Sequence, residues 1–261
     1  MDKDKIIDVS IDAVVGLIPA FAGLTGKAVW AASAALVSPF LQQQIKEVAH
    51  WSLGNIQRKK VEYSTQCLCE TIASKIQKEE ELRQDSFFEF KDNPQLRIEE
   101  SSASKLTEGM LLKAKEEYDS KKIPFLSYLT ANIFFLPDIS ESKAFVMLEI
   151  LSKLSYRQLC ALSIFYKEKK LPVGIWEARL KGTPSLQSYY DIAYEFISLK
   201  DLLLIEQDMP TGGIGMGIGI PNYKISALGE ELYIAANLTT IDEHDLLDLN
   251  NKIEFITSSI H

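Results

Sequence analysis

A long, almost uncharged stretch near the N-terminus constrains the fold of this chain most. Residues 13–41 read AVVGLIPAFAGLTGKAVWAASAALVSPFL, and Lys27 is the only charged residue among them. Such a stretch requires burial, in a protein core, in an oligomer interface or in a bilayer. Because Lys27, Pro19 and Pro39 interrupt it, it is unsuited to one clean membrane span of about twenty apolar residues.

The stretch predicts two helices, at about residues 9–18 and 20–37, that carry small side chains four residues apart. This spacing lets helix backbones approach closely, so we expect packing against the rest of the chain or against a second copy. The candidate interaction residues here are Gly16, Ala20, Gly23 and Gly26. Conditional membrane insertion through residues 9–41 is the alternative, although no Lys/Arg face of the kind that interfacial binding recruits precedes Arg58.

The overall charge argues against partners that are themselves strongly negative. The chain has 28 basic and 36 acidic residues, a net charge of −8 at pH 7 and a pI near 5.1. At long range this charge repels nucleic acid and anionic lipid, so either partner would need a local basic patch.

Cysteine and histidine positions predict neither disulfides nor a metal centre. The three cysteines, Cys67, Cys69 and Cys160, are odd in number, and the closest pair has one intervening residue, which suits neither a disulfide framework nor a zinc site. The three histidines are far apart in the sequence. We therefore expect no metal or cofactor and a reducing compartment. The start of the chain lacks the pattern of a secretory signal, which favours a cytoplasmic location, with membrane association in an active state as the alternative.

The charged middle of the chain predicts an amphipathic helix followed by a connection. Apolar residues at three- and four-residue steps indicate one long helix, or two in line, over residues 42–83. Residues 79–105 are rich in charge and contain Pro94, so we expect a mobile hinge there, with helix resuming over residues 106–118. Three aromatic residues instead suggest a short strand or an element that docks on a neighbouring surface: Phe87, Phe88 and Phe90.

The C-terminal half predicts several short helices and a hairpin. We expect helices from Pro124 to about Pro137, over 141–153 with Ser140 as the cap, and after the capping box formed by Ser155 and Gln158. A longer helix is predicted from Ser185 to Leu204, and a last one over residues 228–238. Between them, alternating apolar residues on a glycine background predict a strand, with a turn at residues 221–222 and a second strand at 223–225.

Two strings in this half resemble the winged helix-turn-helix superfamily. LSYRQLCALSIF resembles its first helix, and FISLKDLLLIEQ followed by YKISALGEELY resembles the end of its recognition helix, the wing and the exit. At the end of the recognition helix, just before the closing Leu-Ile, such families usually have Gly. This chain has Leu203 there, so we expect the recognition helix to continue past this position. The expected fold is mainly α, with a helical N-terminal region and a C-terminal winged-helix-like module that contains a small β-hairpin. We divide the chain into residues 1–83, 84–123 and 124–261.

The order of these regions also resembles the Abi-alpha group of bacterial abortive-infection proteins. That resemblance covers most of the chain: a Gly/Ala-rich helical start, a charged helical middle and a winged-helix-like end. It implies phage defence and does not imply a particular biochemical activity.

The residue types on the predicted recognition helix disfavour DNA binding. Base readout needs Arg, Lys, Asn or Gln on its exposed face, whereas Asp191, Glu195 and Asp201 would face phosphates unfavourably. If the module binds DNA, the candidates are Lys169, Lys170, Arg179, Lys181, Gln187 and Lys200. We therefore favour a protein-protein role, with a DNA-binding transcriptional regulator as the alternative and a membrane-perturbing effector that uses the N-terminal apolar helices as the second alternative.

No catalytic motif is recognisable, so we expect a protein that is not an enzyme. The alternate glycines of residues 213–219 match neither the phosphate-binding loop nor the dinucleotide fingerprint, and no Gly-x-Ser-x-Gly nucleophile elbow occurs. A flat hairpin edge without Lys or Pro would pair readily with other chains unless it is covered. We therefore predict that residues 213–220 pack on another part of the protein or on a partner. The expected contacts are Ile214, Ile218 and Ile220.

Overall fold

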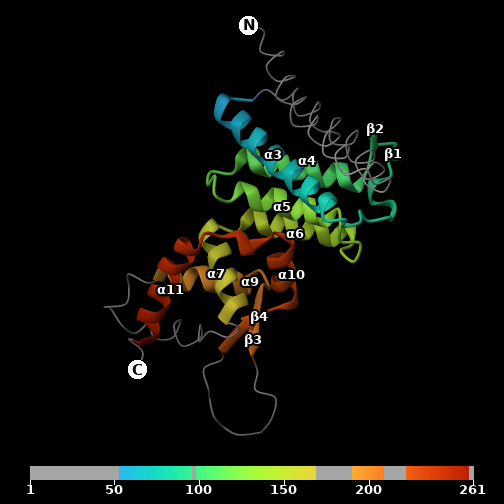
Figure 1. The fold of residues 1–261 in the computed structure, drawn as a ribbon. Coiled ribbons are helices and arrows are strands. Elements are labelled where there is room, and N and C mark those ends of the chain that lie inside the picture. The colour runs from blue at the N-terminus through green and yellow to red at the C-terminus, as the bar shows by residue number, and fades with distance from the viewer. Residues whose placement is uncertain (1–52, 96–97, 169–189, 209–221, 259–261) are drawn as a thin grey trace. The chain divides into compact units, whose positions relative to one another are not determined.

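The computed structural model describes residues 53–95, 98–168, 190–208 and 222–258, and these are mainly helical (Figure 1). They also contain two small antiparallel sheets of two strands each. The chain divides into two compact units, residues 1–152 and 153–261. The predicted mainly helical fold with a small hairpin is confirmed for these described residues.

In the first unit, α3 (Asn55–Gln77) packs against both α4 (Ser102–Glu116) and α5 (Ile123–Ile133). The buried residues of α3 recur at three- and four-residue steps, as the amphipathic pattern predicted. They are Val61, Ser64, Leu68, Ile72 and Ile76, and the neighbouring Cys67 and Cys69 are buried as well. Among the described residues, this unit also contains α6 (Glu141–Lys153), which approaches α4 closely. A Cβ atom added at Gly109 would lie 3.3 Å from Leu148 Cδ2.

Helix α4 begins four residues earlier than predicted because a serine caps it. The Ser101 hydroxyl oxygen accepts a hydrogen bond from the Ser104 amide at 3.0 Å, and the Ser101 amide donates to the Ser104 hydroxyl at 2.8 Å. These reciprocal bonds satisfy two donors at the helix start. The predicted apolar stripe of this helix is buried, at Leu106, Met110, Leu111 and Ala114.

The segment between α3 and α4 contains regular structure where it is described, and its mobility stays a prediction. It contains a 3-10 turn, η1 (Ser86–Phe88), and the paired strands β1 (Lys91–Asn93) and β2 (Ile98–Glu100). Phe87 is buried, and the centroids of the Phe87 and Phe88 rings lie 6.3 and 5.2 Å from that of Phe134. The predicted docking of these aromatics on a neighbouring surface is confirmed for this pair.

A buried arginine holds this segment on the helical core. The side chain of Arg83 is 2% exposed; it forms an ion pair with Asp85 and donates to the carbonyl of Ile139 at 3.0 Å. Its guanidinium carbon also lies 4.1 Å from the centroid of the Phe87 ring. Because a buried guanidinium needs acceptors for its donors, these contacts fix the path of the chain after α3.

A buried ion pair connects the start of α5 with the last residue of the first unit. The Lys122 ammonium lies 2.6 Å from Glu117 Oε2 and donates to the carbonyl of Ser152 at 2.7 Å. The two charged side chains are 4% and 7% exposed. The pair therefore brings together the loop before α5 and the carboxyl end of α6.

The second unit has the predicted order of helices, hairpin and helix. Its elements are α7 (Tyr156–Glu168), α9 (Tyr190–Asp201), β3 (Ile205–Asp208), β4 (Asn222–Ile225), α10 (Ala227–Ala235), η3 (Leu238–Thr240) and α11 (Glu243–Ser258). Helix α7 packs against α9, α10 and α11. The predicted capping box is present: the Ser155 amide donates to Gln158 Oε1 at 2.7 Å, and the Gln158 amide donates to Ser155 Oγ at 3.1 Å.

The hairpin strands differ from those predicted. Strand β4 pairs with β3, from Ile205 opposite Ile225 to Asp208 opposite Asn222, and Asn222, which was predicted to lie in a turn, belongs to β4. The strand that follows α9 was missed because its IEQD sequence has only one apolar residue at its start. The glycine-rich residues themselves lie outside the described part of the chain.

Helix α9 stops at Asp201 without a glycine, so the expectation that Leu203 would let it run on was wrong. Leu203 itself takes the left-handed conformation, with φ of 59°. Its amide donates to the Lys200 carbonyl at 2.9 Å, and the Leu204 amide reaches back to the Leu199 carbonyl at 2.9 Å. This is the hydrogen-bond pattern of a helix end that usually requires glycine.

The compact units differ from the domains that we drew from the sequence. Helices α5 and α6, which we placed in the C-terminal module, belong to the first unit. The Ser127 hydroxyl of α5 lies 2.9 Å from the Ser64 hydroxyl of α3 and donates to the Ser64 carbonyl at 2.9 Å. The boundary is therefore at residues 152/153 and not at 123/124.

Candidate functional site

Helix α9 and the turn that follows it each expose one large apolar side chain. Tyr194 and Leu203 are 67% and 71% exposed, and we call these two residues the α9 surface. The Ser226 hydroxyl donates to the Leu203 carbonyl at 2.6 Å, which ties the left-handed residue to the start of α10. Exposed aromatic side chains such as that of Tyr194 are enriched in protein interfaces.

The charges near the α9 surface include one ion pair and one lysine that lies over an aromatic ring. Lys224 and Glu206 on the hairpin form an ion pair at 3.2 Å. Lys200, the only cation of α9, has its ammonium 5.8 Å from the centroid of the Tyr223 ring. This helix therefore offers phosphate groups one lysine, while its sequence contains three acidic residues.

Of the nucleic-acid candidates, only Lys200 lies within the described residues. The other five lie outside them: Lys169, Lys170, Arg179, Lys181 and Gln187. The interaction candidates from the sequence also lie outside them: Gly16, Ala20, Gly23, Gly26, Ile214, Ile218 and Ile220. Lys200 is therefore the one predicted site residue whose surroundings the structure describes.

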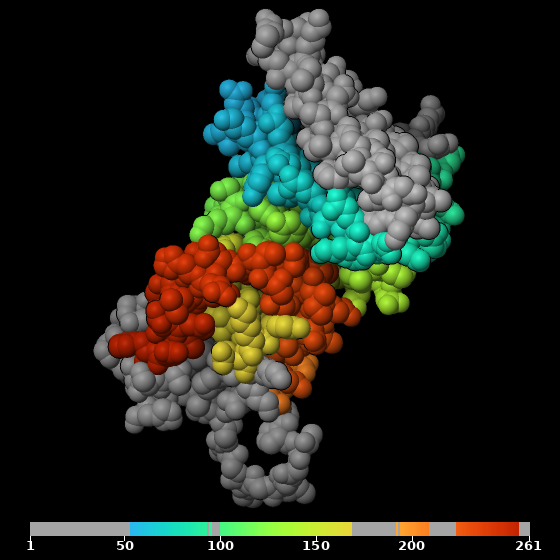
Figure 2. All heavy atoms as spheres, in the orientation of Figure 1, coloured from blue at the N-terminus to red at the C-terminus, as the bar shows by residue number. Residues whose placement is uncertain are grey.

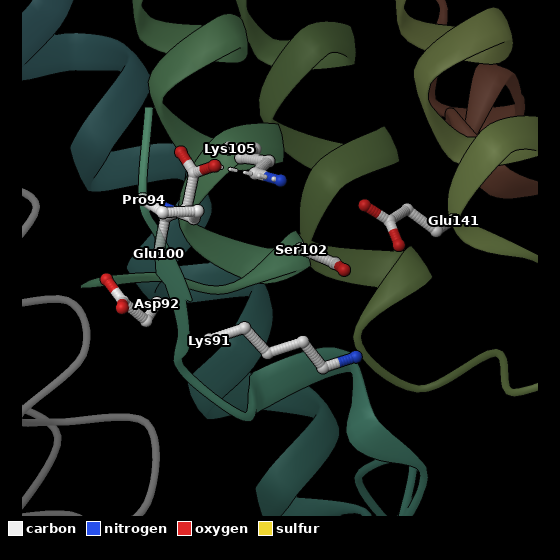
Figure 3. A pocket seen from close by; sticks show the side chains of 7 residues that line it. All are labelled: Lys91, Asp92, Pro94, Glu100, Ser102, Lys105 and Glu141. Carbon is white, nitrogen blue, oxygen red and sulfur yellow. Dashed lines mark ion pairs between the residues drawn. The ribbon is translucent and has the colours of Figure 1, made fainter. Parts of the chain in front are cut away.

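A charged hollow of about 250 Å³ lies beside the β1–β2 hairpin, where the first turns of α4 and α6 meet it (Figure 3). Its lining consists of Lys91, Asp92, Pro94, Glu100, Ser102, Lys105 and Glu141. The Lys105 ammonium is paired with Glu100 at 3.1 Å. Sequence reasoning missed this hollow because its residues come from three separate elements and form no local motif. It contains three carboxylates and two ammonium groups, and no thiol or imidazole is among these seven side chains.

The cysteines are not placed for nucleophilic chemistry. All three are buried. Burial, with a smaller effect of the nearby Glu70 carboxylate, raises the pKa of Cys67 to about 11 and that of Cys69 to about 12. Since the thiolate is the reactive form, these side chains are unreactive near neutral pH.

The described ranges also lack two other kinds of site. No group of three or more His, Cys, Asp or Glu side chains is arranged to hold a metal ion. No helix there has the length and apolar character needed to cross a bilayer.

Comparisons with known proteins returned no relative of this chain. No protein-family model matches it, and neither a curated protein nor a solved structure is significantly similar to it. The chemistry of the described surfaces is then the guide to function. The α9 surface is apolar and exposed, and the hollow beside the β1–β2 hairpin is charged. The cysteine thiols are buried.

Proposed function

We propose that this chain is a non-enzymatic protein-interaction protein that acts through oligomerisation or partner docking, and that its second unit is a winged-helix-like module used for docking. The order α7, α9, β3, β4 and α10 supports the winged-helix part of the proposal. The resemblance to the Abi-alpha group adds phage defence as its setting. The observation that carries the proposal is the exposed, left-handed Leu203.

The conformation and the exposure of Leu203 both cost free energy in a chain that has no bound partner. The left-handed conformation costs a non-glycine residue roughly 1–2 kcal/mol, and most of this side chain remains in contact with water. Glycine would form the same helix end with less backbone strain. A strained residue that exposes an apolar side chain is a reasonable candidate for function, because contact with a partner would bury it.

The proposal is tested by quantitative capture of partners from the native host with the full-length chain as bait. We expect Leu203→Gly and Tyr194→Ala to lose the same bound proteins, while Ile234→Ala, an exposed apolar residue on α10, retains them. If all three variants capture the same proteins as the wild type, the α9 surface is not the docking site.

Oligomerisation through the N-terminal apolar helices is the second part of the proposal. We expect the full-length chain to associate at micromolar concentration, and removal of residues 1–41 to reduce this association. Light scattering measures both. A monomeric full-length chain, or a truncated chain that associates equally well, would contradict this role for the segment.

The alternatives make different predictions. A winged-helix transcriptional regulator would bind a selected DNA site with nanomolar affinity in physiological salt and lose it on Lys200→Ala, whereas we expect weak, nonspecific binding that declines steeply with salt. A membrane-perturbing effector would release dye from vesicles and lose that activity without residues 9–41. We propose a cytoplasmic location for the interaction protein, with membrane association only under this last alternative.

A further inference from the structure

The hollow beside the β1–β2 hairpin is lined by charged side chains that the fold leaves without partners. Lys105 pairs with Glu100 at 3.1 Å. Among the described residues, Lys91, Asp92 and Glu141 line the same hollow, are exposed, and form no ion pair or side-chain hydrogen bond. Teal atoms from this part of the chain are visible on the molecular face in Figure 2. The hollow therefore has one unpaired positive charge and two unpaired negative charges.

Donors and acceptors are separated within the hollow. Lys91 is opposite Glu100 in the strand register, so these two side chains lie on the same face of the hairpin. In Figure 3 the Lys91 ammonium, the Ser102 hydroxyl and the Glu141 carboxylate lie on one side of the hollow, and Asp92 lies on the other. Ser102 is the first residue of α4, where backbone amides lack acceptors within the helix and favour an anion. One small ligand can thus contact a cation, a hydroxyl and two carboxylates.

The unpaired charges and the volume of the hollow restrict the class of ligand. A simple anion such as phosphate would meet two unpaired carboxylates, and a metal ion would be repelled by the Lys91 ammonium. The hollow, at about 250 Å³, is smaller than the roughly 300–1,000 Å³ of sites for drug-sized ligands, so its ligand is small. A zwitterion with one additional cation matches the three unpaired charges one for one. Free basic α-amino acids carry this set of groups.

We propose that this hollow binds a free basic α-amino acid such as lysine. The ligand carboxylate accepts hydrogen bonds from Lys91 and Ser102, its α-ammonium donates to Glu141, and its side-chain cation reaches Asp92 across the hollow. Because water and salt compete for exposed charges, the affinity is in the millimolar range and declines as salt is added. This binding goes beyond the proposed function and requires neither docking at the α9 surface nor oligomerisation.

Calorimetric titration of the full-length chain with lysine and three analogues, at low salt, tests the proposal. Each analogue lacks one charged group of lysine: cadaverine lacks the carboxylate, ε-aminocaproate lacks the α-ammonium, and norleucine lacks the side-chain ammonium. We expect each analogue to bind at least threefold more weakly than lysine, because each leaves one charge of the hollow unmatched. Free glutamate should bind more weakly still, since its side-chain carboxylate would face Asp92.

Matched variants assign each contact to one group of the ligand. Lys91→Met should weaken lysine binding at least threefold and should not weaken cadaverine binding, because cadaverine has no carboxylate. For the same reason Glu141→Gln should not weaken binding of ε-aminocaproate, and Asp92→Asn should not weaken binding of norleucine. Lys59→Met, at an exposed lysine of α3, is the control and should leave every titration unchanged.

The outcomes separate this proposal from its alternatives. Absence of saturable lysine binding overturns it, as does lysine binding that any of the three hollow substitutions leaves unchanged. If phosphate binds more tightly than lysine and Lys91→Met abolishes phosphate binding, the hollow is an anion site and the amino-acid assignment is overturned. Partner capture and light scattering, which test docking and oligomerisation, do not depend on the hollow, so either proposal can fail while the other stands.

Discussion

The left-handed Leu203 predicts that alanine and glycine exchange their usual order of stability at this position. Leu203→Ala and Leu203→Gly both remove the exposed side chain, so their difference isolates the backbone. Glycine avoids the strain of roughly 1–2 kcal/mol but loses about 0.5–1 kcal/mol through its freer unfolded chain. We therefore expect Leu203→Gly to be more stable than Leu203→Ala by about 0.5–1 kcal/mol, given the φ of 59°.

A helical position with similar exposure is the control. Tyr194 lies inside α9 and is 67% exposed. There Tyr194→Ala should be more stable than Tyr194→Gly by about 1 kcal/mol. Urea denaturation followed by circular dichroism gives the free energy of unfolding of all four variants. If alanine is favoured at position 203 by the same amount as at 194, the helix end does not hold residue 203 in the left-handed conformation, and the strain argument fails.

Three further predictions concern the rest of the fold. Gly229→Ala should lower the free energy of unfolding by more than about 2 kcal/mol, because a Cβ there would lie 2.1 Å from the Leu204 carbonyl oxygen; urea denaturation measures this. The hydrogen bonds from Arg83 lower the pKa of Asp85, so Asp85→Asn should be less stable than the wild type at neutral pH, and the difference should disappear as pH falls through the lowered pKa. The buried cysteines should react slowly with a thiol reagent at pH 8 in the folded chain and rapidly in denaturant.

The starts of α6 and α7 were predictable because their signals are local. Ser140 caps α6 through a 3.3 Å bond from the Lys143 amide, and the Ser155 and Gln158 box precedes α7 as expected. Each of these signals involves residues three apart in sequence. The N-terminal helix candidates and the glycine-rich segment lie outside the described residues and stay predictions.

The features that sequence reasoning missed depend on distant contacts. The left-handed Leu203 is held in part by Ser226, 23 residues further on, through the hydroxyl bond to its carbonyl. The contact of α5 with α3 joins serines 63 residues apart, so no local pattern could assign α5 to the first unit. Helix α11 was missed although Asp242 accepts a bond from the His244 amide at its start, because charged residues on both sides of its buried stripe obscured the apolar period.

The buried pair of Lys122 and Glu117 determines where the two units can be separated. Besides its ion pair with Glu117, the Lys122 ammonium donates a hydrogen bond to the carbonyl of Ser152, the last residue of the first unit. A fragment that ends before this residue would leave a buried ammonium without one of its acceptors, and breaking such a pair costs about 3–5 kcal/mol when a charge loses its partner altogether. Independent expression of the first unit therefore depends on including the peptide group of Ser152, and a fragment cut at the domain boundary that we first drew from the sequence would lack both α5 and α6.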